Sequence, residues 1–176
     1  MNRYAAWLRG IMPSNPNMRN DKVRAVFEGL GFEGVGSLLA SGNIIFGSAE
    51  TDMAAMESRI QAALQAELGI GGGTIIRSRD ELQALVDSDP FPGLTHTNST
   101  YLTATFLKDR AGSAPPELPE RLGQTVQIVR YDPPAAAVLA IIDNTAANHM
   151  SWLESVYGKD ITTRTWLTVQ KALAKL

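Results

Sequence analysis

Apolar residues in the first half of the chain follow two alternating periods. Spacings of three and four residues predict two amphipathic helices, one through Val23–Leu30 that ends at Gly31 and one from about Glu50 to Leu68 that ends at Gly69. Short apolar runs predict four strands, at Arg3–Leu8, Val35–Leu39, Ile44–Phe46 and Thr74–Arg77. The resulting order is β-α-β-β-α-β, which is the ferredoxin-like arrangement of an antiparallel sheet with two helices on one face.

The middle of the chain contains the strongest candidate for a boundary. Ser78-Arg79-Asp80-Glu81 has the Ser-x-x-Glu form of a capping box and predicts a short helix that runs to about Val86. Asp89-Pro90-Phe91-Pro92-Gly93 follows, and its two prolines and its glycine predict a loop. We therefore expect a first subdomain at 1–88 and a second at 94–176.

The second half repeats the order of elements without any detectable sequence identity to the first half. Its expected strands are Tyr101–Leu107, Thr125–Tyr131, Ala136–Ile142 and the short extended stretch Asp160–Thr163. Its expected helices are a short one near Glu117–Leu122, one at His149–Val156 and a closing one at Arg164–Ala174. The predicted fold class is α+β, with two ferredoxin-like βαββαβ units, each with an antiparallel sheet, plus a C-terminal helix.

Composition narrows the class of protein. The 176 residues are 44% hydrophobic, which excludes a disordered chain, and the longest apolar runs are too short to span a bilayer. There is no cysteine, so thiol catalysis and cysteine-based metal sites are excluded. A net charge of −2 argues against a protein whose main function is to bind nucleic acid. With no export signal at the N-terminus, the expected location is the cytoplasm, and no feature indicates an oligomeric state.

Few residues offer the usual chemistry of an active site. The two histidines, His96 and His149, lie in a polar loop and near a predicted helix start, without a recognisable nucleophile or orienting partner. Carboxylates are scattered without the spacing of a metal loop. The glycines of Gly69–Gly73 precede a strand, whereas a phosphate loop precedes a helix. No metal or cofactor is expected.

The βαββαβ order also occurs in RNA-recognition motifs, which stack bases on aromatic residues of the two central strands. Here Tyr4 and Trp7 point to opposite faces of the first strand, and the third strand offers only Phe46. Because no basic, aromatic-rich signature surrounds these residues, nucleic acid is an unlikely partner.

Polar residues at two loops predict a candidate ligand site. In the ferredoxin-like topology the first and third strands are adjacent and antiparallel, so the end of one lies beside the start of the other. Arg9 and the loop with Asn15 and Asn17 should thus lie near Ser41 and Asn43. Turn chemistry explains the same residues without a ligand, since Asn and Gly suit a turn and arginine can bond loop carbonyls.

A third polar segment lies in the tail. The threonines of Thr162–Thr165 can cap the closing helix, and free N–H groups at a helix start together with Arg164 suit an anionic group. Thr163 and Arg164 therefore complete the set of candidate ligand-binding residues. The alternative is a capped helix whose Trp166 and Val169 only seal the core.

The same segments resemble a bacterial family catalogued as domain of unknown function 1697. The resemblance rests on Leu8-Arg9-Gly10-Ile11, Ser41-Gly42-Asn43-Ile44-Ile45-Phe46, Pro90-Phe91, and Thr162-Thr163-Arg164-Thr165-Trp166 with Thr168-Val169. It covers nearly the whole chain, and it implies an α+β protein with ferredoxin-like subdomains. It implies no activity.

Two departures from the family pattern bear on the candidate site. The family continues its first block as Ile-Asn-Val-Gly-Gly followed by a basic residue and Asn, whereas this chain has Ile11-Met12-Pro13-Ser14-Asn15-Pro16-Asn17. The family has Arg-Asn-Trp-Asn-Thr near its C-terminus, whereas this chain has Arg164-Thr165-Trp166-Leu167-Thr168. If the family binds a ligand through these loops, the changes predict a different ligand or a loss of binding in this chain.

Three classes of function stay open from the sequence. The first hypothesis is a protein that binds a small anionic ligand, such as a nucleotide or a phosphorylated metabolite, at the Arg9 and Asn43 edge of the sheet. The second is an enzyme of low turnover that acts through an electrostatic pocket. The third is a nucleic-acid or protein-interaction module that uses the open face of the sheet.

Overall fold

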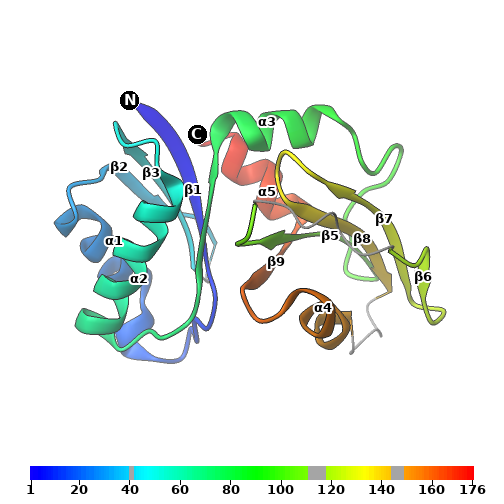
Figure 1. The fold of residues 1–176 in the computed structure, drawn as a ribbon, viewed down its shortest axis with the longest axis horizontal. Helices are drawn as coiled ribbons and strands as arrows, with labels where there is room; N and C mark the ends of the chain where they lie inside the picture. Colours follow the sequence, from blue (N-terminus) through cyan, green and yellow to red (C-terminus); the bar gives the residue numbers. More distant parts are fainter. Residues whose placement is uncertain (40–41, 111–117, 144–148) are drawn as a thin grey trace. The chain divides into compact units, whose positions relative to one another are not determined.

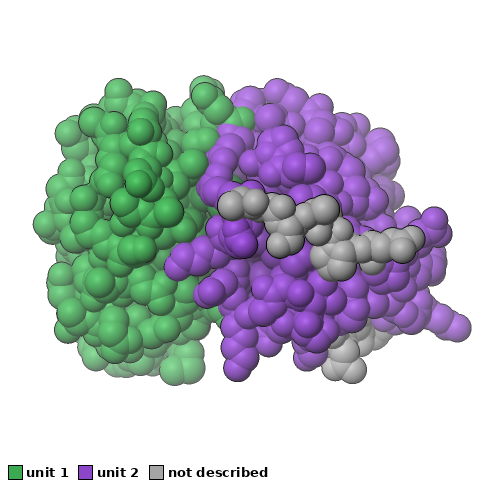
Figure 2. All heavy atoms as spheres, in the orientation of Figure 1, with its two compact units in different colours: residues 1–80, 171–176 green, residues 81–170 purple. Residues whose placement is uncertain are grey.

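The computed structural model describes residues 1–39, 42–110, 118–143 and 149–176. The chain divides into two compact units (Figure 2). Unit 1 consists of residues 1–80 together with 171–176, and unit 2 consists of residues 81–170. The division falls between Asp80 and Glu81, inside the helix that begins at Arg79 and earlier than the loop Asp89–Gly93 that the prolines indicate.

Unit 1 has the predicted β-α-β-β-α-β order (Figure 1). Its elements are β1 (Asn2–Leu8), the short 3-10 helix η1 (Pro16–Met18), α1 (Asn20–Gly29), β2 (Glu33–Ser37), β3 (Asn43–Ser48), α2 (Met53–Leu68) and β4 (Thr74–Ser78). The four strands form an antiparallel sheet in the order β2-β3-β1-β4. The ferredoxin-like prediction is confirmed for this unit.

The core of unit 1 lies between the sheet and its two helices. Alternate residues of β1 (Tyr4, Ala6 and Leu8) face the apolar stripes of α1 and α2, as the three- and four-residue spacing predicts. Phe46 of β3 lies at the centre of this core, with its ring centroid 5.5 Å from the rings of both Tyr4 and Phe27. The aromatic cluster therefore fixes both helices on one face of the sheet.

The β4 strand lies at the edge of this sheet, and α2 supplies partners for its outer backbone groups. The Glu57 carboxylate accepts a hydrogen bond of 2.7 Å from the backbone N–H of Ile76, and the Gln61 amide oxygen accepts one of 3.0 Å from Thr74. Glu57 and Gln61 are four residues apart, so they lie on one face of the helix. Two backbone donors that an edge strand would otherwise expose are thereby satisfied.

The glycine-rich connection from α2 to β4 has a steric cause. Gly69 ends α2 in the left-handed conformation, with φ 69°. Gly72 lies against the end of β1, where a Cβ atom would stand 1.8 Å from the carbonyl oxygen of Arg9. The Arg9 N–H donates to the Gly73 carbonyl at 2.8 Å, which holds the two segments together. Only glycine fits at position 72.

The remaining elements run from the end of unit 1 through unit 2. They are α3 (Arg79–Asp87), β5 (Thr100–Leu107), β6 (Arg121–Leu122), β7 (Val126–Asp132), β8 (Ala137–Asp143), α4 (His149–Tyr157), β9 (Ile161–Thr165) and α5 (Trp166–Leu173). The second sheet is also antiparallel, in the order β6-β7-β8-β5-β9. Without β6, this is the strand order of unit 1, so the predicted α+β class with two antiparallel sheets is confirmed.

Two predicted helices of the second half differ in the structure. The short helix expected near Glu117–Leu122 is wrong at its described end, because Arg121 and Leu122 form β6 and pair with Gln127 and Val126 across a turn at Gly123. The closing helix begins at Trp166 and not at Arg164. Arg164 continues β9 because it pairs with Ala104 of β5.

Unit 2 buries apolar residues on both faces of its sheet. One face carries the cluster that includes Val138, Ile142 and Leu153 of α4. On the other face, residues such as Leu102 and Phe106 are fully buried. Among the described residues, no helix has the length and apolar composition needed to cross a membrane.

Candidate functional site

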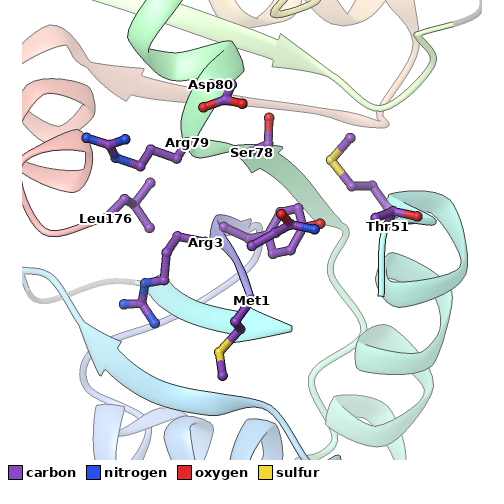
Figure 3. Close-up of a pocket in the computed structure, with 10 residues that line it drawn as sticks. Met1, Arg3, Thr51, Ser78, Arg79, Asp80 and Leu176 are labelled. Carbon is purple, nitrogen blue, oxygen red and sulfur yellow. The ribbon is translucent and has the colours of Figure 1, made fainter. Parts of the chain in front are cut away.

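A cavity of about 560 Å³ opens in unit 1 where four elements meet (Figure 3). These are the start of β1, the end of β4, and the first residues of α2 and α3. Its lining residues are Met1, Asn2, Arg3, Tyr4, Thr51, Met53, Ser78, Arg79, Asp80 and Leu176. The volume is in the range of cavities that bind metabolite-sized molecules.

Two arginines dominate the charge of this cavity. Arg3 extends from β1, and Arg79 is the first residue of α3 (Figure 3). Across the described residues, no carboxylate forms an ion pair with either guanidinium group. Asp80 is the acidic lining residue, so the lining side chains carry more positive than negative charge. A local positive field therefore exists on a chain whose net charge is −2.

Glycines position Arg3. Its Nη1 and Nη2 atoms both lie 3.4 Å from the Gly34 carbonyl oxygen, which is a long contact for a hydrogen bond. A Cβ atom at Gly34 would stand 2.7 Å from Arg3 Nη1, and one at Gly47 would stand 3.2 Å from the same atom. The Arg3 side chain thus lies across two residues that have no side chain, and its weak contacts leave most of its donor capacity unused.

The predicted site lies at the other end of β1. The register places Trp7 opposite Asn43, and the Leu8 N–H donates to the Gly42 carbonyl at 2.8 Å. The main chains of Arg9 and Asn43 are therefore close, as the ferredoxin-like topology predicts. The Arg9 side chain is half-buried, and Ser41 lies outside the described residues.

The Asn43 side chain is engaged in its own hairpin. It is only 4% exposed, and its amide nitrogen donates to the Leu38 carbonyl at 3.1 Å. The Leu38 N–H donates in turn to the Asn43 carbonyl at 2.8 Å. These two bonds clamp the connection between β2 and β3.

We therefore expect Asn43→Ala to destabilise unit 1 by about 1.5 kcal/mol, because the partly buried Leu38 carbonyl loses the donor of the buried Asn43 side chain. Asn17→Ala is the control, since the Asn17 side chain is exposed and contacts only Lys22 Nζ among the described residues, at 3.2 Å. Its expected effect is below about 0.5 kcal/mol. Urea unfolding followed by circular dichroism measures both, and equal effects would contradict the clamp.

The loop asparagines serve local structure. The Asn15 side-chain oxygen Oδ1 accepts from the Asn17 N–H at 3.0 Å and caps η1. The Asn17 side chain is at the surface. Neither residue lines the cavity.

The tail residues Thr163 and Arg164 belong to unit 2. The Thr163 hydroxyl lies 2.7 Å from the Thr105 hydroxyl on the neighbouring strand. Arg164 Nη1 donates to the Thr162 hydroxyl at 2.7 Å and to the Thr163 carbonyl at 2.9 Å. Desolvation by burial lowers the pKa of Arg164 to about 10, so the group stays charged at neutral pH. The predicted cap is present, because the Thr165 hydroxyl accepts from the Thr168 N–H.

The His96 side chain serves the local structure of its loop. Its Nδ1 accepts from the Leu102 N–H at 3.2 Å, and its ring stacks on Tyr101 with 5.1 Å between centroids. No group of three histidine or acidic residues within the described ranges is arranged to hold a metal ion.

The comparisons with known proteins settle the family. The sequence profile described as "Protein of unknown function (DUF1697)" matches residues 1–129. The chain belongs to this family. The resemblance of the Arg9 and Asn43 blocks is therefore confirmed, and this DUF1697 member carries both blocks within the matched region.

A solved structure has the same fold as this DUF1697 protein. It is described as the structure of conserved bacterial protein SP0830 from Streptococcus pneumoniae, and it superposes with a TM-score of 0.68. The match covers 99% of this chain and 98% of that chain, at 17% sequence identity. At this identity the likeness concerns the fold alone. The search of the curated proteins found no match.

Sequence reasoning missed the two arginines of the cavity in this DUF1697 protein. Arg3 stands inside an expected strand, and Arg79 stands inside a capping box, so each has a sufficient local explanation. One signal was available. The strands β1 and β4 are adjacent and antiparallel, so the start of β1 lies beside the end of β4. This rule brings Arg3 close to Ser78 and Arg79.

Proposed function

We propose that unit 1 binds a small anionic ligand, a phosphorylated or carboxylated metabolite, in the cavity between β1, β4, α2 and α3, and that the protein acts in the cytoplasm. One observation carries the proposal: Arg3 and Arg79 face the same cavity, and no described carboxylate neutralises either guanidinium group. Arginine binds phosphate and carboxylate groups through paired, charge-assisted hydrogen bonds.

The other polar groups of the cavity suit the same chemistry. The Ser78 hydroxyl lines the cavity at the end of β4, and α3 starts directly after it. The first N–H groups of a helix have no partner within the helix and favour a negative charge. Asp80 is the one acidic side chain of the lining and opposes an anion, so its removal has a predictable sign.

The Arg9 edge is the weaker location for this function. Its Asn43 amide is buried and already donates to the Leu38 carbonyl. Asn15 and Asn17 serve η1, and Thr163 with Arg164 belongs to the other unit. Arg9→Ala nevertheless tests that edge directly and belongs in the same experiment.

Binding of RNA on the central strands is disfavoured in this proposal. The aromatic residues of β1 and β3 (Tyr4, Trp7 and Phe46) are all buried, so they offer no face for a base. The net charge of −2 also gives no general attraction to a phosphate backbone.

The proposal predicts opposite effects of two neighbouring substitutions on the binding of pyrophosphate. Arg79→Ala should weaken binding about tenfold, because it removes one charge-assisted contact. Asp80→Asn should tighten binding by about threefold, because it removes a like charge near the anion. Isothermal titration calorimetry at low and high salt measures both, and the affinity of the unaltered protein should fall as salt rises.

Arg19→Ala is the matched control. Arg19 is an exposed arginine of unit 1 that pairs with Asp21 at 3.2 Å, and it does not line the cavity. Its affinity should equal that of the unaltered protein. If Arg9→Ala abolishes binding while Arg79→Ala has no effect, the site lies at the Arg9 edge and the cavity is excluded. If pyrophosphate, inorganic phosphate and simple carboxylates all fail to bind, the proposed function is wrong.

A further inference from the structure

The cavity is lined by apolar side chains as well as by the two arginines. Met1, Met53 and Leu176 line it together with the ring of Tyr4. In Figure 3, Met1 and Leu176 lie with Arg3 and Arg79 around the cavity, and Thr51 lies at the start of α2. A bare inorganic anion would leave the cavity-facing surface of these apolar side chains exposed to water.

No aromatic ring of the cavity is free to stack on a nucleobase. Tyr4 is the aromatic lining residue, and it is 3% exposed. Its hydroxyl donates to the Glu50 carbonyl at 2.8 Å, and its ring stacks on Phe46 in the core. Sites that select nucleotides usually hold the base against an aromatic face. The apolar side of this cavity is built from methionine and leucine side chains, which pack against flexible aliphatic groups.

The size of the cavity points the same way. At about 560 Å³ it is far larger than a single phosphate or carboxylate group requires. If the anionic group lies near Arg3 and Arg79, where Leu176 also lies, the space that remains extends toward Thr51 and the start of α2, where Met53 stands. A ligand that fills the cavity therefore has a portion beyond its anionic group, and this portion has an apolar surface.

We propose that the ligand class is a short aliphatic molecule with one anionic head, such as an alkyl phosphate ester, and not a nucleotide. This inference rests on the proposed anion site. The head binds between Arg3 and Arg79, and the chain extends toward Met53 at the start of α2. Each methylene group that leaves water should tighten binding by about fourfold until the cavity is full.

The test measures the affinity of the full chain for inorganic phosphate, methyl phosphate, propyl phosphate and adenosine monophosphate by calorimetry. Affinity should rise by about fourfold for each methylene from methyl to propyl phosphate. Adenosine monophosphate should bind no more tightly than inorganic phosphate. In Arg79→Ala every member of the series should bind more weakly, but affinity should still rise by the same factor for each methylene. That result would show that the head and the chain bind to separate parts of the cavity.

One variant examines the apolar lining. Met53→Gln should flatten the dependence on chain length, and circular dichroism shows whether the variant is folded. Met12→Gln is the control, because Met12 is a methionine of unit 1 that is 55% exposed and does not line the cavity. It should keep the full dependence.

The outcomes separate this inference from the proposed function. If inorganic phosphate binds but propyl phosphate binds no better, the ligand class is wrong and the anion site stands. If adenosine monophosphate binds most tightly, the ligand is a nucleotide and the inference is overturned. If no member of the series binds, the anion site itself is wrong.

Discussion

Gly72→Ala is expected to lower the free energy of unfolding of unit 1 by about 3 kcal/mol. A Cβ atom at this position would stand 1.8 Å from the Arg9 carbonyl oxygen, 2.5 Å from its carbonyl carbon and 3.2 Å from the Gly10 nitrogen. All three are backbone atoms, so no side-chain rotation relieves the clash. The hydrogen bond from the Arg9 N–H to the Gly73 carbonyl resists the separation of the two segments.

The neighbouring residue supplies the control for this prediction. Gly73 has no atom within 4 Å of an added Cβ, and its φ lies outside the left-handed region. Gly73→Ala should change the free energy of unfolding by less than about 1 kcal/mol, and a small gain is possible through the lower entropy of the unfolded chain. Urea unfolding followed by circular dichroism gives both values. Similar losses for the two variants would show that the close approach at Gly72 is not rigid.

Glu57→Ala should cost unit 1 about 2.5 kcal/mol, because the buried N–H of Ile76 loses the side-chain oxygen that accepts its hydrogen bond. The Glu57 side chain is 3% exposed, so water does not readily replace it. Glu57→Gln keeps an acceptor oxygen at the same position and should retain about half of that stability. Gln61→Ala, which removes the acceptor of the Thr74 N–H, should cost about 1 kcal/mol.

Hydrogen exchange at single residues distinguishes this mechanism from a general loss of packing. In Glu57→Ala the Ile76 amide should exchange much faster, while amides in the centre of β1 change only with global stability. If Ile76 stays as protected as its neighbours in β1, Glu57 does not hold the edge of the sheet. Loss of all protection together would indicate that Glu57 acts on the whole unit.

The sequence predicts the regular part of the fold well, for local reasons. The amphipathic spacing of α2 and its terminal Gly69 depend on residues within one helix, and both agree with the structure. The pairing of β1 with β3 follows from topology alone, and the register between Trp7 and Asn43 agrees with it. These features need no knowledge of distant side chains.

The features that the sequence did not predict depend on distant residues. Gly72 is explained by the Arg9 carbonyl, which lies more than sixty positions earlier in the chain. Arg164 continues β9 because β5 offers it a partner, although its own neighbours suit a helix start. Arg3 and Arg79 line the same cavity, and neither residue belongs to a sequence motif that predicts a binding site. Local patterns carry no signal for contacts of this kind.

The division of the chain also affects the order in which the protein is completed during synthesis. Unit 1 contains residues 1–80 and 171–176, so the ribosome makes all of unit 2 between the two parts of unit 1. At typical rates of elongation, the intervening residues take roughly 5–20 s. The ferredoxin-like sheet can form in that interval, but Leu176, which lines the cavity, is not yet present. A nascent chain can therefore form a folded sheet before the lining of this cavity is complete, so a molecule that needs the complete cavity would act only on the last stage of maturation.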